Sequence, residues 1–505
     1  MSGPLTDDRV PVIVGVGQLR DNRERSLDAA RSPLDLLTDV IGRAAADSGA
    51  ATLAAQADTI GIVNVLGWSY DGLAALVKTE IGGGATRLID SPIGGNQPAK
   101  LLDDAAAAIV AGDSRIAVLG GVEAVASMRA FLAAGKVPDW TPGGFPNVNV
   151  ADIASEIMLR YQLAPPVRAY PLYENGLRAH LGQTFEEAYR SAAQLFADFT
   201  TVAATQPAAW DPEVRTADDI GTVTDRNRLV CQPYPVRMNA QIAVNQAAAV
   251  IVTSVAAARE AGIDESRWVY VRSGAGAADS DDLLSRVDFH SDPAMAAVLD
   301  ESLQRAGLAA ADVDVLDLYS CFPIVPKLAA AYLDRPLGAD LTATGGLSAF
   351  GGPGNNYSMH ALAAVTDRLR VEPGVGLVYA NGGMLTKHHA VVLDSARPAH
   401  PFRGGDVDGA FATEHPPVVE PTAGTGTIET YTVEFNRDGT PKRGWVIGRT
   451  EAGERFPAVV TDAASMAELA RTDLEPIGRR GIIDTVGEDE DEKIVGLTAF
   501  IVAPD

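Results

Sequence analysis

Apolar residues fall in short continuous runs that alternate with amphipathic or alanine-rich segments along most of the chain. Residues 10–17, VPVIVGVG, are rich in β-branched side chains, a pattern typical of a strand buried on both faces. A helical segment is expected at residues 33–48 and a second strand at residues 59–66. Strands that alternate with helices predict an α/β fold whose sheet contains parallel pairs.

Residues 86–121 combine a short strand, a glycine turn, an alanine-rich helix and a second buried strand. Asn96 or Gln97 is placed to cap this helix, and Pro98 fits its first turn, where a missing N–H costs nothing. The helix is apolar on most sides, which predicts that it is buried. Its amino end would direct the helix dipole and free amides toward whatever lies beside Gly95.

The alternation of strands and helices returns in the second half of the chain. Strands are expected at residues 269–272, 313–318, 375–380 and 389–393, and helices at residues 293–306, 325–333 and 357–369. Because the two halves carry similar element orders, we predict a duplicated α/β unit. The alternative is a single large doubly wound sheet, which the irregular stretch between the halves makes awkward.

The remaining segments predict an insertion and an added domain. Prolines, aromatics and charges mix after residue 128, whereas residues 396–422 have the composition of a linker. Beyond the linker, the turn signals Asp438-Gly439 and Ala452-Gly453 separate expected strands, a pattern typical of a small OB-like β-barrel. The predicted domains are 1–127 (first half), 128–245 (insertion), 246–395 (second half), 396–422 (linker) and 423–505 (barrel).

Composition narrows the class of protein. The 505 residues carry a net charge of -25, which argues against general binding to nucleic acid or anionic membranes. No run approaches the roughly 20 apolar residues that span a bilayer, and the first residues lack the pattern of a signal peptide. With two cysteines, Cys231 and Cys321, no disulfide framework is expected, and no Cys/His spacing predicts a metal site. We therefore expect a cytoplasmic protein.

Residues 86–121 resemble the first signature of the thiolase superfamily, in which a strand, a turn with a nucleophilic Cys and a buried helix follow one another. Counting back from Gly112-Asp113, the Cys position falls on Gly95, which has no group to attack a thioester. The resemblance implies a duplicated thiolase fold of βαβαβαββ halves in five α-β-α-β-α layers. It points to sterol-carrier-protein-thiolase-like and acetyl-CoA acetyltransferase-like members with an added OB-like domain. Residues 244–249, VNQAAA, resemble the alanine-rich helix that enters the second half of such proteins.

Three further thiolase signatures can be located. Residues 319–322, YSCF, stand where thiolases have a His-Asp-Cys-Phe run, so Tyr319 takes the oxyanion-binding place and Cys321 is the rival nucleophile. Gly352 replaces the His that activates the nucleophile. Tyr379 lies at or beside the place of the second catalytic Cys, and His388 follows as a candidate base. The alternative is that Tyr319 only fills a helix–sheet interface and that His388 only flanks a strand. Ordinary thiolysis is not expected without the three classical side chains.

The resemblance also implies coenzyme A or an acyl-CoA as the ligand. Arg226, Arg228 and Arg237 cluster within an acidic chain, and guanidinium groups suit the phosphates of this nucleotide. Scattered surface arginines are the alternative explanation of this cluster. Ser348 and Gly351, in the third signature, belong to a glycine-rich stretch that permits close approach of backbone to a ligand.

Three classes of function stay open. The first is a thiolase-like acyl-CoA-binding protein of the acyltransferase class in lipid metabolism, without ordinary turnover. The second is a retro-aldolase acting on a β-hydroxyacyl-CoA with Tyr319 and Tyr379, as in similar thiolase-like aldolases that work with a separate OB-fold partner. The third is a non-catalytic carrier or scaffold whose barrel engages a protein partner. Both a monomer and a dimer are compatible with the sequence.

Overall fold

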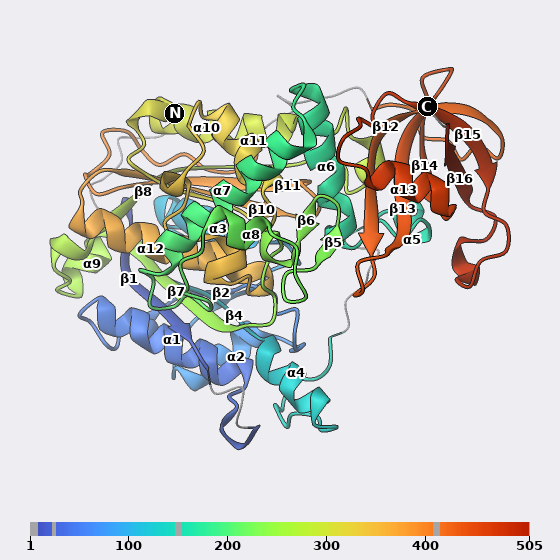
Figure 1. The fold of residues 1–505 in the computed structure, drawn as a ribbon. Helices are drawn as coiled ribbons and strands as arrows, with labels where there is room; N and C mark the ends of the chain where they lie inside the picture. The colour runs from blue at the N-terminus through green and yellow to red at the C-terminus, as the bar shows by residue number, and fades with distance from the viewer. Residues whose placement is uncertain (1–8, 23–26, 147–153, 408–414, 504–505) are drawn as a thin grey trace.

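The structure, a computed structural model, describes residues 9–22, 27–146, 154–407 and 415–503 (Figure 1). The strands of the first α/β half are β1 (Pro11–Arg20), β2 (Thr59–Ile62), β3 (Arg87–Asp90), β4 (Ile116–Ala124) and β7 (Asn245–Ser254). Its helices are α1 (Pro33–Asp47), α2 (Leu73–Glu80), α3 (Gln97–Ala111), α4 (Val125–Ala133) and α9 (Val255–Glu260).

The second half repeats this plan. Its strands are β8 (Val269–Ala278), β9 (Val315–Leu318), β10 (Val375–Gly382) and β11 (Lys387–Asp394). Its helices are α10 (Pro293–Ala306), α11 (Ile324–Tyr332) and α12 (Tyr357–Val371). A short pairing of β1 with β8 joins the halves into one nine-stranded sheet, ordered β3-β2-β4-β7-β1-β8-β11-β10-β9.

The strand directions confirm the predicted duplication. Outward from the junction, β1–β7 and β7–β4 are antiparallel and β4–β2 is parallel. On the other side, β8–β11 and β11–β10 are antiparallel and β10–β9 is parallel. The two halves therefore have the same topology, and β3 is one additional strand at the edge of the first half.

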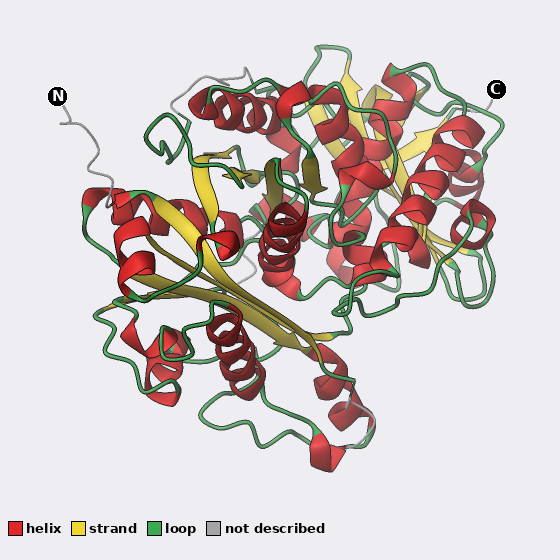
Figure 2. Cartoon of the chain, turned by 90° about the vertical axis from the view of Figure 1, so that its left-hand side faces the viewer, coloured by secondary structure: helices red, strands yellow, loops and turns green. Residues whose placement is uncertain are grey.

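The helices form three layers around the two sheet halves. Helices α3 and α12 contact each other and lie between the halves, whereas α1 and α2 cover the outside of the first half (Figures 1 and 2). Helices α10 and α11 cover the outside of the second half. The predicted five-layer thiolase arrangement is confirmed, and the alanine-rich helix α3 is at its centre.

Local signals explain where the helices begin and end. Ser32 caps α1 in a capping box with Asp35, and Pro33 occupies its first turn. Pro98 lies in the first turn of α3 as predicted, but the side chain of Asn96, at the N-cap, makes no capping hydrogen bond. Gly112 ends α3 in the left-handed region, with φ of 85°, where glycine carries no steric penalty.

The resemblance of residues 244–249 to a helix was wrong, because all of them except Val244 belong to strand β7. This strand runs antiparallel to both β1 and β4, and every one of its residues is buried. Its alanines are small enough to fit under the helices on both faces of the sheet, with Ala247 and Ala249 on one face and Ala248 on the other. Burial on both faces therefore decided the conformation of this alanine run.

The insertion and the added domain pack against each other. The insertion contains α5 (Glu156–Arg160), α6 (Pro166–His180), α7 (Phe185–Ala203), α8 (Ala217–Gly221), β5 (Leu229–Cys231) and β6 (Tyr234–Pro235). The added domain contains β12 (Gly424–Phe435), β13 (Pro441–Thr450), β14 (Arg455–Val460), α13 (Ala463–Ala470), β15 (Arg480–Thr485) and β16 (Thr498–Val502). Pairing of β12 with both β13 and β15 closes its strands into the predicted barrel, and β5 adds to β12. Of the predicted linker, residues 408–414 lie outside the described residues.

Buried hydrogen bonds fix the barrel on the insertion. Trp445 Nε1 donates to the carbonyl of Tyr161 at 2.8 Å, and Thr430 Oγ1 donates to the carbonyl of Leu172 at 2.6 Å. Asn175 Nδ2 donates to the carbonyl of a barrel tyrosine at 2.9 Å. Because unpaired polar groups are costly when buried, these bonds hold the barrel and α6 in one arrangement.

Candidate functional site

The turn before α3 brings Gly95 against the ends of β9 and β10. A β-carbon at Gly95 would overlap the Asn381 carbonyl oxygen. It would also lie 2.7 Å from Tyr319 Oη and 3.1 Å from Tyr319 Cζ. The place of a nucleophilic side chain is therefore already filled by a backbone oxygen and a phenol. Gly95 is therefore required by this packing, because any larger residue would overlap its neighbours.

The second signature follows β9 and fills the space around Gly95. Tyr319 donates its backbone N–H to the carbonyl of Tyr379 at 3.0 Å, and its ring meets Tyr357 edge to face at 5.5 Å. Burial raises the pKa of the Tyr319 phenol far above its usual range. Burial also raises the pKa of the Cys321 thiol to about 12. Cys321 is therefore a thiol at neutral pH and a poor nucleophile.

An aromatic residue of the insertion completes this cluster of buried side chains. Tyr170, on α6, stacks on Phe322 with 4.5 Å between ring centroids. Its hydroxyl accepts a hydrogen bond from Asn381 Nδ2 at 2.9 Å and donates to the carbonyl of Gly383 at 3.0 Å. The sequence analysis missed Tyr170, because nothing in its local sequence says that α6 reaches the end of β10.

At the third signature, the two glycines differ in how closely their neighbours pack. A β-carbon at Gly352 would lie 3.3 Å from Ala240 Cβ and 3.5 Å from the carbonyl oxygen of Gln241. Gly351, with φ of 119°, has the side chain of Gln246 against its α-carbon. Ser348 is half-buried in a short π-helical turn, Gly346–Phe350. In the described structure, the groups that approach the glycines of this loop closely are thus neighbouring protein groups.

In the fourth signature, Tyr379 and His388 form a hydrogen-bonded pair. Tyr379 Oη and His388 Nδ1 lie 2.7 Å apart, and both side chains are buried. Burial raises the pKa of Tyr379 well above its usual range and lowers the pKa of His388. A protonated phenol beside a neutral imidazole donates to Nδ1, which leaves the imidazole proton on Nε2.

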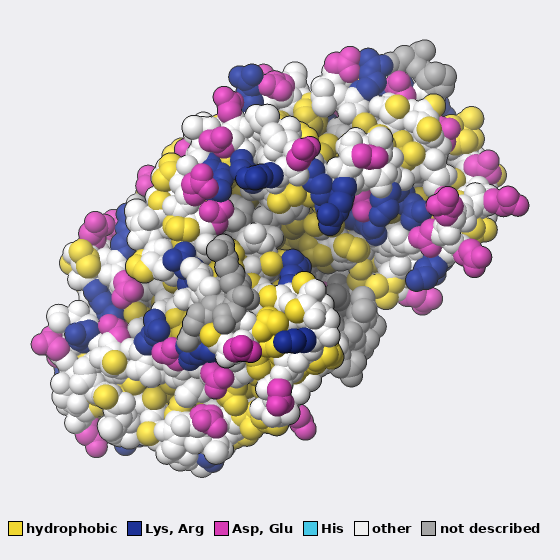
Figure 3. Space-filling view, turned by 60° about the horizontal axis from the view of Figure 1, so that its bottom comes forward, with side chains coloured by type: hydrophobic (Ala, Val, Ile, Leu, Met, Phe, Trp, Pro, Cys, Tyr) yellow, Lys and Arg dark blue, Asp and Glu magenta, His cyan; other side chains and the backbone are white. Residues whose placement is uncertain are grey.

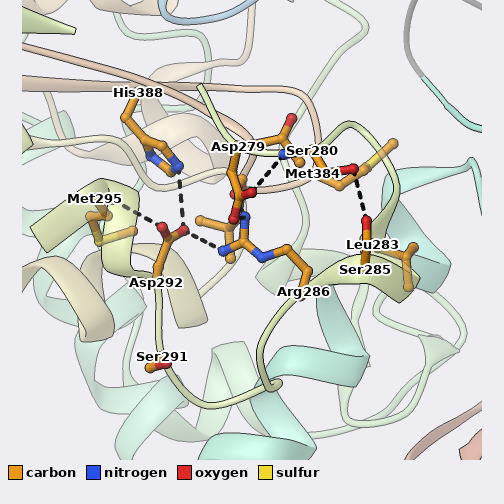
Figure 4. Close-up of polar contacts among 12 residues, drawn as sticks. Asp279, Ser280, Leu283, Ser285, Arg286, Ser291, Asp292, Met295, Met384 and His388 are labelled. Atoms are coloured by element: carbon orange, nitrogen blue, oxygen red, sulfur yellow. Dashed lines mark hydrogen bonds and ion pairs between the residues drawn. The ribbon is translucent and has the colours of Figure 1, made fainter. Parts of the chain in front are cut away.

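His388 belongs to a buried charge cluster that the sequence analysis also missed (Figure 4). His388 Nε2 lies 3.4 Å from Asp292 Oδ2, and Asp292 lies 3.0 Å from Arg286 Nη2. Arg286 also contacts Asp279 at 3.3 Å, and these side chains are at most 9% exposed. Asp292 precedes a proline and reads in sequence only as a helix cap, a role that it also plays toward Met295.

The three predicted coenzyme A arginines lie together near β5 and β6 but have different surroundings. Arg226 is exposed, whereas Arg228 and Arg237 are half-buried. Arg228 donates to the carbonyl of Leu229 at 3.2 Å, and Arg237 donates to the carbonyl of Asp219 at 2.5 Å. On the face shown in Figure 3, acidic and basic side chains are interspersed.

Among the described residues, no helix is long and apolar enough to cross a membrane. Within the same residues, no group of three or more His, Cys, Asp or Glu side chains is arranged to hold a metal ion.

The nine-stranded sheet with its three helix layers, together with the added barrel, defines a protein of thiolase-like fold. A model of the thiolase-like protein type 1 additional C-terminal domain matches residues 407–491. The chain is 32% identical to a monomeric SCP2-thiolase-like protein type 1 from Mycobacterium smegmatis, with a TM-score of 0.80 over 99% of this chain and 100% of that one. The chain therefore belongs to the SCP2-thiolase-like proteins of type 1.

More distant structures share only the fold. An Ltp2-ChsH2(DUF35) aldolase is 17% identical, with a TM-score of 0.58 over 78% of this chain and 100% of its own. Human mitochondrial 3-ketoacyl-CoA thiolase is 14% identical, with a TM-score of 0.57 over 77% of this chain and 99% of its own. No curated protein sequence matches this chain.

Proposed function

We propose that this protein binds coenzyme A or an acyl-CoA and does not catalyse cysteine-dependent thiolysis. The observation that carries this proposal is the filled nucleophile position at Gly95, where a backbone oxygen and the Tyr319 phenol leave no room for a thiolate. Cys321 offers no substitute, because its thiol is buried and its pKa is raised to about 12. By homology the protein belongs with the acyltransferases, but its residues at the aligned positions do not support acyl transfer through a cysteine.

The ligand is proposed from the fold and from the insertion. A human 3-ketoacyl-CoA thiolase of the same fold has been solved in complex with CoA, at 15% identity and a TM-score of 0.57. In this proposal residues 128–245 cover the nucleotide, and the guanidinium groups of Arg226, Arg228 and Arg237 meet its phosphates. The half-buried Ser348 would face the pantetheine arm, whereas the predicted contact at Gly351 is not part of this proposal because the side chain of Gln246 covers that residue. As the Mycobacterium smegmatis relative is described as monomeric, we propose the same state here.

Titration calorimetry with CoA and acetyl-CoA tests this proposal. We expect micromolar affinity that falls about tenfold or more in the triple variant Arg226→Ala, Arg228→Ala, Arg237→Ala. Arg190→Ala removes a guanidinium of the same insertion that is 78% exposed and paired with Glu186, so it is the matched control and should not weaken binding. Absence of heat at millimolar ligand would contradict the proposal, and thiolysis of acetoacetyl-CoA would contradict its second part.

A second candidate function is retro-aldol cleavage of a β-hydroxyacyl-CoA. In that reaction the β-hydroxyl passes its proton to the Tyr379 oxygen while this phenol passes its own proton to His388 Nδ1, the Cα–Cβ bond breaks, and the electron pair moves onto the thioester as an enolate. The α-carbon then takes up a proton, which gives an acyl-CoA and a ketone or aldehyde. The observation that favours this candidate is the Tyr379–His388–Asp292 chain, which offers a phenol backed by a neutral imidazole and a carboxylate. Tyr319, protonated, would donate to the enolate oxygen.

Incubation with a 3-hydroxyacyl-CoA, followed by mass spectrometry, distinguishes the candidates. An aldolase releases an acyl-CoA and a carbonyl compound, and Tyr319→Phe abolishes this release without weakening the binding of CoA. A carrier binds the thioester and leaves it intact. A scaffold does not bind it, and the thioester again stays intact. The substitution removes one hydroxyl from a packed ring, so the fold should be retained.

A further inference from the structure

A pocket of about 230 Å³ opens between α6, α7 and α11. None of the residues of the four thiolase signatures lines it. Its walls combine apolar side chains with a small set of charged ones, the combination typical of small-molecule sites. The pocket is therefore separate from the site described above.

The walls and mouth of the pocket are apolar. Leu177 on α6 and Leu328 on α11 form part of the walls, together with Ala331. At the mouth, Leu181 is 56% exposed and Leu337 is 42% exposed. Two exposed leucines beside an apolar cavity leave apolar surface in water that a ligand tail would cover.

The floor of the pocket carries a buried ion pair. Lys327 Nζ donates to Glu174 Oε1 at 2.5 Å, and its second contact is to the carbonyl of Ala188 at 3.4 Å. Glu174 also accepts a hydrogen bond from the Tyr234 hydroxyl at 2.6 Å, so its oxygens are both engaged. An ammonium group has three donors, and the second contact here is long. The Lys327 ammonium can therefore donate a further hydrogen bond to a ligand, whereas both oxygens of Glu174 already accept one.

The charges that line the pocket are mainly positive. Arg178 and Arg335 line it together with Lys327, against one carboxylate, that of Glu174. Arg178 is paired with Glu475 of the barrel, and Arg335 donates to two backbone carbonyls at 2.6 Å. A cationic lining in a protein of net charge -25 favours an anionic ligand at this place.

We propose that this pocket binds a small carboxylate with a short apolar tail. The carboxylate would lie at the floor near the Lys327 ammonium, and the tail would cover the leucines of the wall and mouth. The volume is below the roughly 300 Å³ at which sites for drug-sized ligands begin, so a short chain such as that of hexanoate fits better than a long one. This site goes beyond the proposed binding of coenzyme A and does not depend on it.

Calorimetry and ligand-observed NMR with hexanoate test the proposal, with hexan-1-ol and acetate as probes that lack the charge and the tail. We expect saturable binding of hexanoate and binding of each probe that is about tenfold weaker or more. Ala331→Phe places a ring in the pocket from an exposed position and should abolish the binding of hexanoate. The matched control is Ala467→Phe, at an exposed position of helix α13, which should leave it unchanged.

Three outcomes would overturn the proposal: no saturable binding of hexanoate at millimolar concentration, equal binding of hexan-1-ol, or binding that survives Ala331→Phe. If Ala331→Phe does not fold, Leu181→Trp closes the mouth from a side chain that is already exposed, and loss of binding is again the expected result. The assay contains no coenzyme A. Failure of the coenzyme A titration and failure of this one are therefore separate results.

Discussion

Replacing Gly95 by alanine tests whether the nucleophile position is packed shut. The added methyl group would overlap the carbonyl oxygen of Asn381 and approach Tyr319 Oη to 2.7 Å. The Asn381 carbonyl belongs to β10, which is paired residue by residue with β11, so it cannot withdraw without breaking a ladder. Tyr319 is held from behind by Tyr357 and by its own backbone bond to Tyr379.

The expected loss of stability follows from this geometry. Inserting one carbon into a well-packed region costs about 1–3 kcal/mol when neighbours shift, and a backbone contact places Gly95→Ala at the upper end. We therefore expect the free energy of unfolding to fall by about 3 kcal/mol. In the double variant Gly95→Ala, Tyr319→Phe the contact with the hydroxyl is relieved, whereas the contacts with the ring carbon and with the Asn381 oxygen are not, so only part of the loss should be recovered.

Urea unfolding followed by circular dichroism measures the effect. Gly42→Ala is the matched control, because Gly42 is exposed within α1 and a β-carbon there meets nothing within 4 Å. A helical Gly→Ala change of that kind should raise stability by about 0.5–1 kcal/mol. If Gly95→Ala and Gly42→Ala shift the midpoint equally, the nucleophile position is not packed as described and the argument against thiolysis fails.

Three further predictions use buried ionisable groups. Cys231 and Cys321 are buried with pKa values raised to about 12, so a thiol reagent should label neither at neutral pH until the protein is unfolded; rapid labelling of the folded protein would refute this. Arg286→Met leaves two buried aspartates without their cation and should cost about 3–5 kcal/mol in urea unfolding, whereas an unchanged midpoint would show that the cluster adds nothing. Burial raises the pKa of Glu123 to about 7 from 4.5, so its stabilising contribution is complete below 4.5 and is lost as the pH rises through 7; Glu123→Gln should flatten the fall in unfolding free energy between about pH 5 and 8, and an unchanged slope would contradict it.

The layers of the fold could be predicted from the sequence because each buried strand and amphipathic helix carries its own periodicity. The thiolase half itself was suggested by the resemblance of residues 86–121 to the first signature of that superfamily, in addition to this periodicity. Strand β7 was the exception. Alanine has no strong preference for strand conformation. The strand forms here because the segment is buried between two other strands and two helix layers, and these neighbours are far away in the sequence.

The candidate site could be predicted only as far as its signatures extend. Gly95, Tyr319 and Tyr379 were proposed because they stand at signature positions, and these roles stay predictions. Tyr170 and Arg286 were not, because each reaches the site from a segment far away in the chain, and their contacts form only in the folded protein. Long-range polar partners of this kind leave no periodic signal in sequence.

The residues at positions 95 and 319 depend on each other through packing. A cysteine at position 95 needs space that the Tyr319 phenol and the Asn381 carbonyl now occupy, and a glycine at position 95 leaves a void unless a bulky neighbour fills it. Restoring the nucleophile alone would therefore overpack the turn, and removing the phenol alone would open a cavity beside α3. Introducing a nucleophile at position 95 would therefore require changes at several residues together. The glycine at position 95 is thus part of the packing of this protein, and Gly95→Cys alone should fail to give thiolysis.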